Sequence, residues 1–257
     1  MKYCFHILWM FIFLLASITA TAQEHRTYTC YRTTSSIRID GKLNEADWEA
    51  APLSEAFVDI RGVDYQPAPA QDTWMKMLWD DECLYIAGIL RETDVTASLT
   101  ERDAIIYRDN DFEVFIDPEG DGKAYFEFEC NAFGTLMDLL MDRPYFRGGS
   151  FFLPWDCRGV RLKVHVDGKI NDNRRPDLGW TVEMAIPFAS LTYGSTHPKS
   201  IPVWRINFSR VQWMVKEGPE ENWVWNPTGK VNMHMPENWG YLKLIDEPVR
   251  PTVTKRR

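Results

Sequence analysis

Apolar and polar residues alternate along most of the chain, with the two-residue period of half-buried β-strands. Phe112, Val114 and Ile116 alternate with Asp111 and Glu113. The same period recurs over residues 125–131, 160–167, 180–186 and 204–209. Because successive side chains of a strand point to opposite faces, each segment presents one apolar face and one polar face. The pattern predicts antiparallel strands with one buried face and one polar face.

Further strands are predicted over residues 74–79 and 84–90, joined by a turn at 80–82, and a last strand over 239–245. Turn sequences separate the strands at the spacing typical of a sandwich. Helical signals are limited to short turns within 44–50 and 187–191. We therefore predict an all-β fold, a jelly-roll-like antiparallel β-sandwich over residues 23–246, with 247–257 as a loose tail.

The N-terminus has the organisation of a secretory signal peptide. Lys2 precedes an apolar run over residues 4–16, and Ala20-Thr21-Ala22 forms a small-x-small cleavage site. The run is short for a membrane helix, although an uncleaved anchor is the alternative. We expect residues 1–22 to be removed and the mature chain to be secreted or periplasmic, with no membrane attachment.

Export places the remaining cysteines in an oxidising compartment. Four cysteines allow three pairings, and buried free thiols are an equally good interpretation. The sequence therefore leaves the state of four residues open: Cys30, Cys83, Cys130 and Cys157.

The composition of the chain excludes some classes of protein and favours others. The net charge is −8 and no block of Lys or Arg lies inside the chain, which argues against a nucleic-acid partner. Apolar residues make up 45% of the chain, which excludes disorder over most of its length. The 11 tryptophans are unusually many, and some are expected to bind a ligand unless all of them pack inside.

Two sets of residues suggest sugar recognition. Carboxylates, amides and guanidinium groups form paired hydrogen bonds with vicinal hydroxyls, and aromatic rings stack on the apolar face of a sugar. The polar set on the strand faces opposite the core is Glu113, Glu127, Glu129, Asn131, Arg205 and Asn207. The aromatic set near strand ends is Tyr107, Tyr145, Phe146, Trp155, Trp213, Trp223 and Trp225. The alternative is a solvated sheet face with aromatic residues in the core.

Other chemistry is less clearly indicated. Asp117, Glu119 and Asp121 are weak candidates for a structural calcium site, and a plain hairpin turn explains them as well. We expect no other cofactor, except that His234 between two methionines is compatible with a haem-binding redox sandwich. A glycoside hydrolase that uses two acids of Glu113, Glu127, Glu129 and Asp138 also stays open.

Five segments resemble the family 9-like carbohydrate-binding modules and occur in that family's order. They are residues 39–48, 78–86, 110–117, 204–210 and 234–242. The resemblance implies a β-sandwich that binds glycan or polysaccharide, often together with secreted glycoside hydrolases. We therefore predict an exported, non-catalytic carbohydrate-binding protein that supports carbohydrate catabolism.

The resemblance also implies roles for individual residues. Glu113 stands where members of the family have a sugar-binding glutamate, Tyr107 near their first stacking tryptophan, and Asn207 at an amide that contacts ligand. Glu129 replaces a strand arginine, and the second stacking tryptophan aligns near Met233. The complete set of predicted site residues is Tyr107, Glu113, Glu129, Asn131, Trp155, Asn207, Trp225 and His234.

Overall fold

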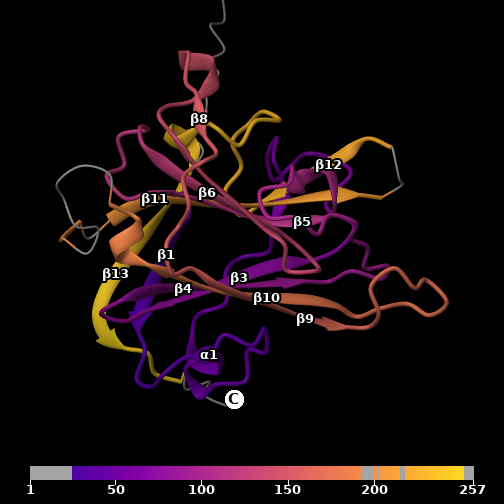
Figure 1. The fold of residues 1–257 in the computed structure, drawn as a ribbon, viewed down its shortest axis with the longest axis horizontal. Coiled ribbons are helices and arrows are strands. Elements are labelled where there is room, and N and C mark those ends of the chain that lie inside the picture. The colour runs from indigo at the N-terminus through magenta and orange to yellow at the C-terminus, as the bar shows by residue number, and fades with distance from the viewer. Residues whose placement is uncertain (1–24, 193–199, 202, 215–217, 252–257) are drawn as a thin grey trace, which may run out of the picture.

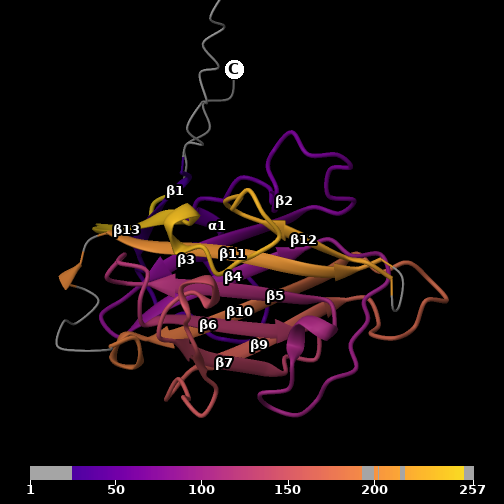
Figure 2. The same ribbon diagram turned by 90° about the horizontal axis from the view of Figure 1, so that it is seen from above.

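Two layers of β-strands face each other across an apolar core in the computed structural model (Figure 1). The structure describes residues 25–192, 200–201, 203–214 and 218–251. Figure 2 shows the same strands from above, with the β5–β6–β7 layer lying over the β4–β10–β9 layer. The predicted all-β sandwich is therefore confirmed.

One layer holds the strands that matter most for the candidate site. Its order is β8-β7-β6-β5-β11, and β12 and then β2 continue from β11. The bounds are β8 Phe151–Phe152, β7 Leu136–Met141, β6 Tyr125–Asn131, β5 Asp111–Asp117, β11 Val203–Trp213, β12 Glu220–Val224 and β2 Val58–Asp59.

The second layer has the order β3-β4-β10-β9, and β13 and β1 connect it to β11 of the first. The bounds are β3 Thr73–Trp79, β4 Cys83–Leu90, β10 Gly179–Pro187, β9 Arg161–Asp167, β13 Gly240–Pro248 and β1 Thr27–Arg32. β13 and β1 run steeply along one side of the molecule, between the two layers in Figure 1. The strand ladder is antiparallel except that β1 pairs parallel to both β13 and β3.

The alternation in the sequence correctly identified the core-facing residues. Phe112, Val114 and Ile116 of β5 are fully buried and pack with Val182 and Met184 of β10. Burial of this many large side chains is the main favourable contribution to folding, at roughly 25 cal/mol per Å² of apolar area. The core positions thereby fix which residues of β5 and β6 point outward.

Helical structure among the described residues is short, as predicted. It comprises one α-helix and several 3₁₀ turns: α1 Ala46–Ala50, η1 Ile106–Arg108, η2 Tyr145–Arg147, η3 Phe188–Ser190 and η5 Pro236–Asn238. Within the described ranges, no helix has the length and apolar character needed to cross a membrane.

Several boundaries differ from the predicted ones. β1, β2, β7, β8 and β12 were not predicted. The last strand continues to Pro248, and Val249 is buried and donates its N–H to the Arg32 carbonyl at 2.8 Å. Residues 247–249 are thus part of the fold, because this pairing covers their backbone. Residues 252–257 and the predicted signal peptide lie outside the described residues.

The cysteines that the sequence left open are free thiols in the structure. All four are buried, three of them in the main apolar core and Cys83 in a second apolar cluster. Cys30 and Cys130 have no exposed surface and behave as small apolar residues.

The outer face of the second layer is closed by α1. Trp48 of α1 is fully buried and packs with Leu78, Tyr85 and Ala185 in a second apolar cluster. Glu183 of β10 lies under this cover with no exposed surface. Its carboxylate accepts hydrogen bonds from Trp48 Nε1 at 2.8 Å, Asp40 N at 2.9 Å and Gly41 N at 3.0 Å. The sequence around α1 therefore serves the fold.

Candidate functional site

The outer face of the first layer carries an open pocket of about 600 Å³. Its floor is the outward side of β5, β6 and β7, where polar and apolar side chains lie next to one another. The floor residues are Glu113, Phe115, Glu127, Glu129, Met137 and Leu139. The walls come from η1, the η2–β8 segment, β11, β12 and residues 231–234.

Two tyrosines stand in the walls of this pocket. Tyr107 of η1 is 42% exposed and Tyr145 of η2 is 46% exposed, so each offers part of its ring to a ligand. The backbone N–H of Tyr107 donates to Glu129 Oε2 at 3.1 Å, and Trp213 Nε1 donates to the Tyr107 carbonyl at 2.9 Å. These bonds hold the Tyr107 backbone directly above the acidic floor.

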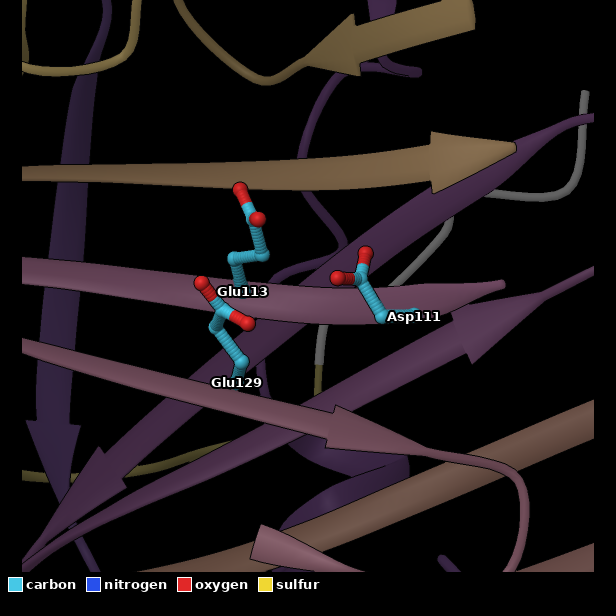
Figure 3. A group of neighbouring side chains, drawn as sticks. All are labelled: Asp111, Glu113 and Glu129. Carbon is cyan, nitrogen blue, oxygen red and sulfur yellow. The ribbon is translucent and has the colours of Figure 1, made fainter. Parts of the chain in front are cut away.

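The acids of the floor arise from the pairing of β5 with β6. Glu113 is paired directly with Glu129, and Phe115 with Glu127. Figure 3 shows Asp111, Glu113 and Glu129 on these neighbouring strands, with their carboxylates gathered together. Like charges directly opposite each other destabilise a sheet, so this arrangement is costly for the fold alone.

The environment of the acids favours their neutral forms. Burial and then the neighbouring Glu129 raise the pKa of Glu113 well above its usual range. Burial and then Glu127 raise the pKa of Glu129 in the same way. Burial and the nearby Glu113 raise the pKa of Glu127 to about 8. These carboxyl groups therefore favour any ligand that supplies positive charge or hydrogen-bond donors.

His234 lies in the wall opposite Tyr107. Its Nδ1 is hydrogen-bonded to the Tyr125 hydroxyl at 2.8 Å, and its Nε2 is 4.0 Å from Glu127 Oε2. Its ring meets the Tyr145 ring edge-on, with 4.6 Å between the centroids. Burial lowers the pKa of His234 to about 4, so the imidazole is neutral at physiological pH.

The structure brings together four of the predicted site residues and separates the other four. Those lining the pocket are Tyr107, Glu113, Glu129 and His234. The remaining four are buried or packed elsewhere and need correction: Asn131, Asn207, Trp155 and Trp225.

The two asparagines are structural. Asn131 is fully buried, accepts from the backbone N–H groups of Phe133 and Thr135, and donates to Asp109 Oδ2. Asn207 is also fully buried, and its amide bonds to the backbone N–H and carbonyl of Asn226. Strand alternation gave the face of each residue correctly, but loops cover both side chains and leave no polar atom for a ligand.

The two tryptophans are packed rather than exposed to a ligand. Trp225 has no exposed surface, and a Cβ atom at Gly240 would lie 2.4 Å from its ring. Trp155 packs on the core side of β6, with its ring centroid 4.9 Å from that of Phe126. Neither lines the pocket, where the exposed aromatic side chains are Tyr107, Tyr145 and Phe151.

The acidic hairpin is held by its own backbone. Asp117 is fully buried and accepts from Gly120 N and Gly122 N, both at 2.8 Å. Glu119 and Asp121 lie on the exposed turn. The hairpin interpretation accounts for these contacts, and calcium binding at this turn stays an untested prediction.

Several pocket residues were missing from the predicted site. Glu127 shares the strand face of Glu129, so its parity was a usable signal. Tyr145 was noted only as a loop aromatic. The apolar floor residues Met137 and Leu139 belong to β7, which was not predicted, so no sequence signal placed them here.

The comparisons with known proteins agree with the resemblance seen in the sequence. The family described as carbohydrate family 9 binding domain-like matches residues 39–247, and the chain belongs to this family. None of the curated proteins searched matches the sequence.

Solved structures show the same fold at low sequence identity. A Bacteroides uniformis protein proposed to bind carbohydrate has a TM-score of 0.67 and 18% identity, over 86% of this chain and 100% of that one. A family 9 carbohydrate-binding module from Caldicellulosiruptor kristjanssonii, in complex with cellotriose, has a TM-score of 0.59 and 15% identity. That match covers 90% of this chain and 100% of the other. The same kind of module in complex with glucose has a TM-score of 0.56 and 15% identity, over 89% and 100% of the chains.

Proposed function

We propose that this protein is an exported, non-catalytic carbohydrate-binding protein that recognises glycan or polysaccharide in the pocket over β5, β6 and β7. The observation that carries the proposal is the combination of exposed tyrosine rings and buried carboxylates around one open pocket. Membership of a carbohydrate-binding family, with relatives crystallised with cellotriose and glucose, supports the same ligand class.

The tyrosines supply the apolar part of recognition. A sugar ring placed against Tyr107 or Tyr145 removes apolar C–H surface from water and contacts a π face, a contribution of about 1–2 kcal/mol. The pocket's volume of about 600 Å³ suits one or two sugar rings rather than a large polymer surface.

The carboxyl groups supply the polar part. A carboxylate that accepts from two hydroxyls forms bonds worth about 1.5–3 kcal/mol. Hydroxyl donors also relieve the loss of hydration that raises the pKa of Glu113 and Glu129. Glycan hydroxyls accordingly add donors to those that the protein already supplies, such as the Tyr107 N–H on Glu129.

The biological role that fits is support of carbohydrate catabolism outside the cytoplasm, beside secreted glycoside hydrolases. A binding module raises the local concentration of an enzyme on its polymer when the two are brought together. The predicted signal peptide supports this compartment.

A glycan array followed by calorimetric titration tests the proposal. We expect binding to a soluble oligosaccharide, for which glucose and cellotriose are the first probes. Reducing-sugar release is measured on the same ligands, because a close carboxylate pair also occurs in retaining glycosidases. An absorption spectrum checks the haem alternative. The proposal would be contradicted by absence of glycan binding, by release of reducing sugar, or by the presence of a Soret band.

A further inference from the structure

The acid cluster over β5 and β6 differs from the other buried acids of the molecule. Asp138 is bonded to Arg102 and to Cys157 N, Glu92 to Arg210 and Trp180, and Glu183 to three N–H groups. Each of these carboxylates has donors that offset the cost of its burial. Asp111, Glu113 and Glu129 are equally buried, and their partners are mainly one another.

The cluster has no basic partner among the residues that the structure describes. Within the described ranges, no Lys, Arg or His side chain forms an ion pair with Asp111, Glu113 or Glu129. Arg210 acts on Asp111 through its charge, but its guanidinium is already bonded to Glu92 and Gln212. Neutralisation must therefore come from protons or from a bound cation.

Geometry favours a single ion. One carboxylate oxygen from each of the three acids lies within 4.8 Å of the others. Opposite oxygens around Ca²⁺ lie about 5 Å apart, twice the usual Ca–O distance, so the three can share one ion without movement of the strands. The close-up in Figure 3 shows their carboxylates converging from neighbouring strands.

Two buried oxygens without a hydrogen bond of normal geometry, one in the cluster and one beside it, point to the same ligand. Asp111 Oδ1 accepts from Val211 N at 2.8 Å, but its Oδ2 has no hydrogen-bond partner, and the residue has no exposed surface. Ser209 of β11 is also fully buried; its Oγ has no hydrogen bond of normal geometry, and it lies close enough to the Glu113 carboxyl group to lower the pKa of that group. Ser209 is paired with Glu113, which places the hydroxyl on the same face as the acids. Carboxylate and hydroxyl oxygens are the ligands that hard divalent cations prefer.

We propose that Asp111, Glu113 and Glu129 bind one divalent cation of the Ca²⁺ type in the pocket floor, with Ser209 Oγ as a fourth oxygen. Ca²⁺ takes six to eight oxygens, so positions remain for water or for ligand hydroxyls on the pocket side. Glu113 and Glu129 line the pocket, whereas Asp111 lies beside Glu113 along β5 and is fully buried. The ion thus presents open positions to a sugar, a role that rests on the glycan binding proposed above.

The first experiment uses the metal alone. The purified protein is freed of metal with EDTA, desalted and titrated calorimetrically with CaCl₂, with MgCl₂ as a comparison. We expect one Ca²⁺ site, with a dissociation constant on the order of 10⁻⁴ M, and a higher melting temperature in Ca²⁺. The proposal is overturned by an absence of Ca²⁺ binding, which would mean that protons neutralise the cluster.

Variants locate the site. Asp111→Asn and Glu129→Gln keep the side-chain shape, and each is expected to weaken Ca²⁺ binding at least tenfold. Asp121→Asn is the matched control, because Asp121 belongs to the exposed acidic hairpin at the other end of β5. Loss of the site in Asp121→Asn with retention in Asp111→Asn would assign the ion to the hairpin instead. Glu113→Gln replaces any variant whose melting curve shows that it is unfolded.

Glucose and cellotriose titrations with CaCl₂ and with EDTA separate the two proposals. Sugar binding that needs Ca²⁺ supports both the proposed glycan binding and the proposed cation site. Sugar binding of equal strength in EDTA keeps the proposed function and overturns the sugar-ligating ion. Ca²⁺ binding to this cluster without binding of any glycan supports the metal site and contradicts the proposed function.

Discussion

Glu183 and Glu113 are both buried glutamates on outer faces of the sandwich, but their surroundings differ. Glu183 lies beneath α1 and receives three N–H donors, including Trp48 Nε1. Glu113 faces Glu129 across the strand pair and lines an open pocket. A covered carboxylate with a complete set of donors stabilises the fold, whereas one without them is available to bind a ligand.

The largest expected effect is a loss of stability at Glu183, on the face of the second layer that α1 covers. Glu183→Ala leaves Trp48 Nε1 and the N–H groups of Asp40 and Gly41 buried without an acceptor. We expect a loss of about 3–5 kcal/mol in the free energy of unfolding, measured by urea denaturation. Glu49→Ala on the exposed side of α1 is the control. A loss below 1 kcal/mol would mean that Glu183 is not the structural acid described here.

A substitution of Asn131 tests whether this buried amide, in the layer that carries the pocket, stabilises the fold rather than binding ligand. Asn131→Ala removes an amide that bonds to Asp109, Leu99, Phe133 and Thr135. We expect the free energy of unfolding to fall by about 2–3 kcal/mol, because these buried partners lose their bonds. Glycan affinity of the folded fraction should stay unchanged, and calorimetric titration would show a direct ligand role if it does not.

Glu113 should behave in the opposite way. Glu113→Gln removes one of two facing carboxyl groups, so the melting temperature should stay the same or rise in metal-free buffer. Glycan affinity should fall roughly tenfold to a hundredfold, corresponding to about 1.5–3 kcal/mol. Titration and a melting curve on the same sample measure both quantities. An unfolded variant would show that Glu113 is a structural acid like Glu183.

The smallest expected effect concerns the stacking surface. Tyr107→Ala should weaken glycan binding about tenfold, since ring stacking contributes about 1–2 kcal/mol. Tyr65→Ala provides the matched control, because Tyr65 is similarly exposed but does not line the pocket. Equal affinities of the two variants, measured by titration, would exclude Tyr107 as a stacking platform.

Much of the fold could be predicted because strand geometry is local. Alternation over five to nine residues identified β5, β6, β9 and β10 and separated Phe112 and Val114 from Glu113. β7 was missed because its sequence, Leu-Met-Asp-Leu-Leu-Met, is apolar on both faces and shows no alternation. Strand period also placed Glu113 and Glu129 outward, and both line the candidate pocket.

The rest depended on what covers each face. Asn131, Asn207 and Trp225 have side-chain types suited to sugar binding, yet segments distant in sequence enclose them. Leu99 accepts from the Asn131 amide, Asn226 bonds to the Asn207 amide, and Gly240 approaches the tryptophan ring. A two-residue period specifies on which face of a strand a side chain lies, but whether α1 closes that face or a pocket opens above it is a matter of long-range packing. For the same reason, only the tertiary structure revealed that Asp111, Glu113 and Glu129 gather around one point, because their proximity requires the register of β5 with β6.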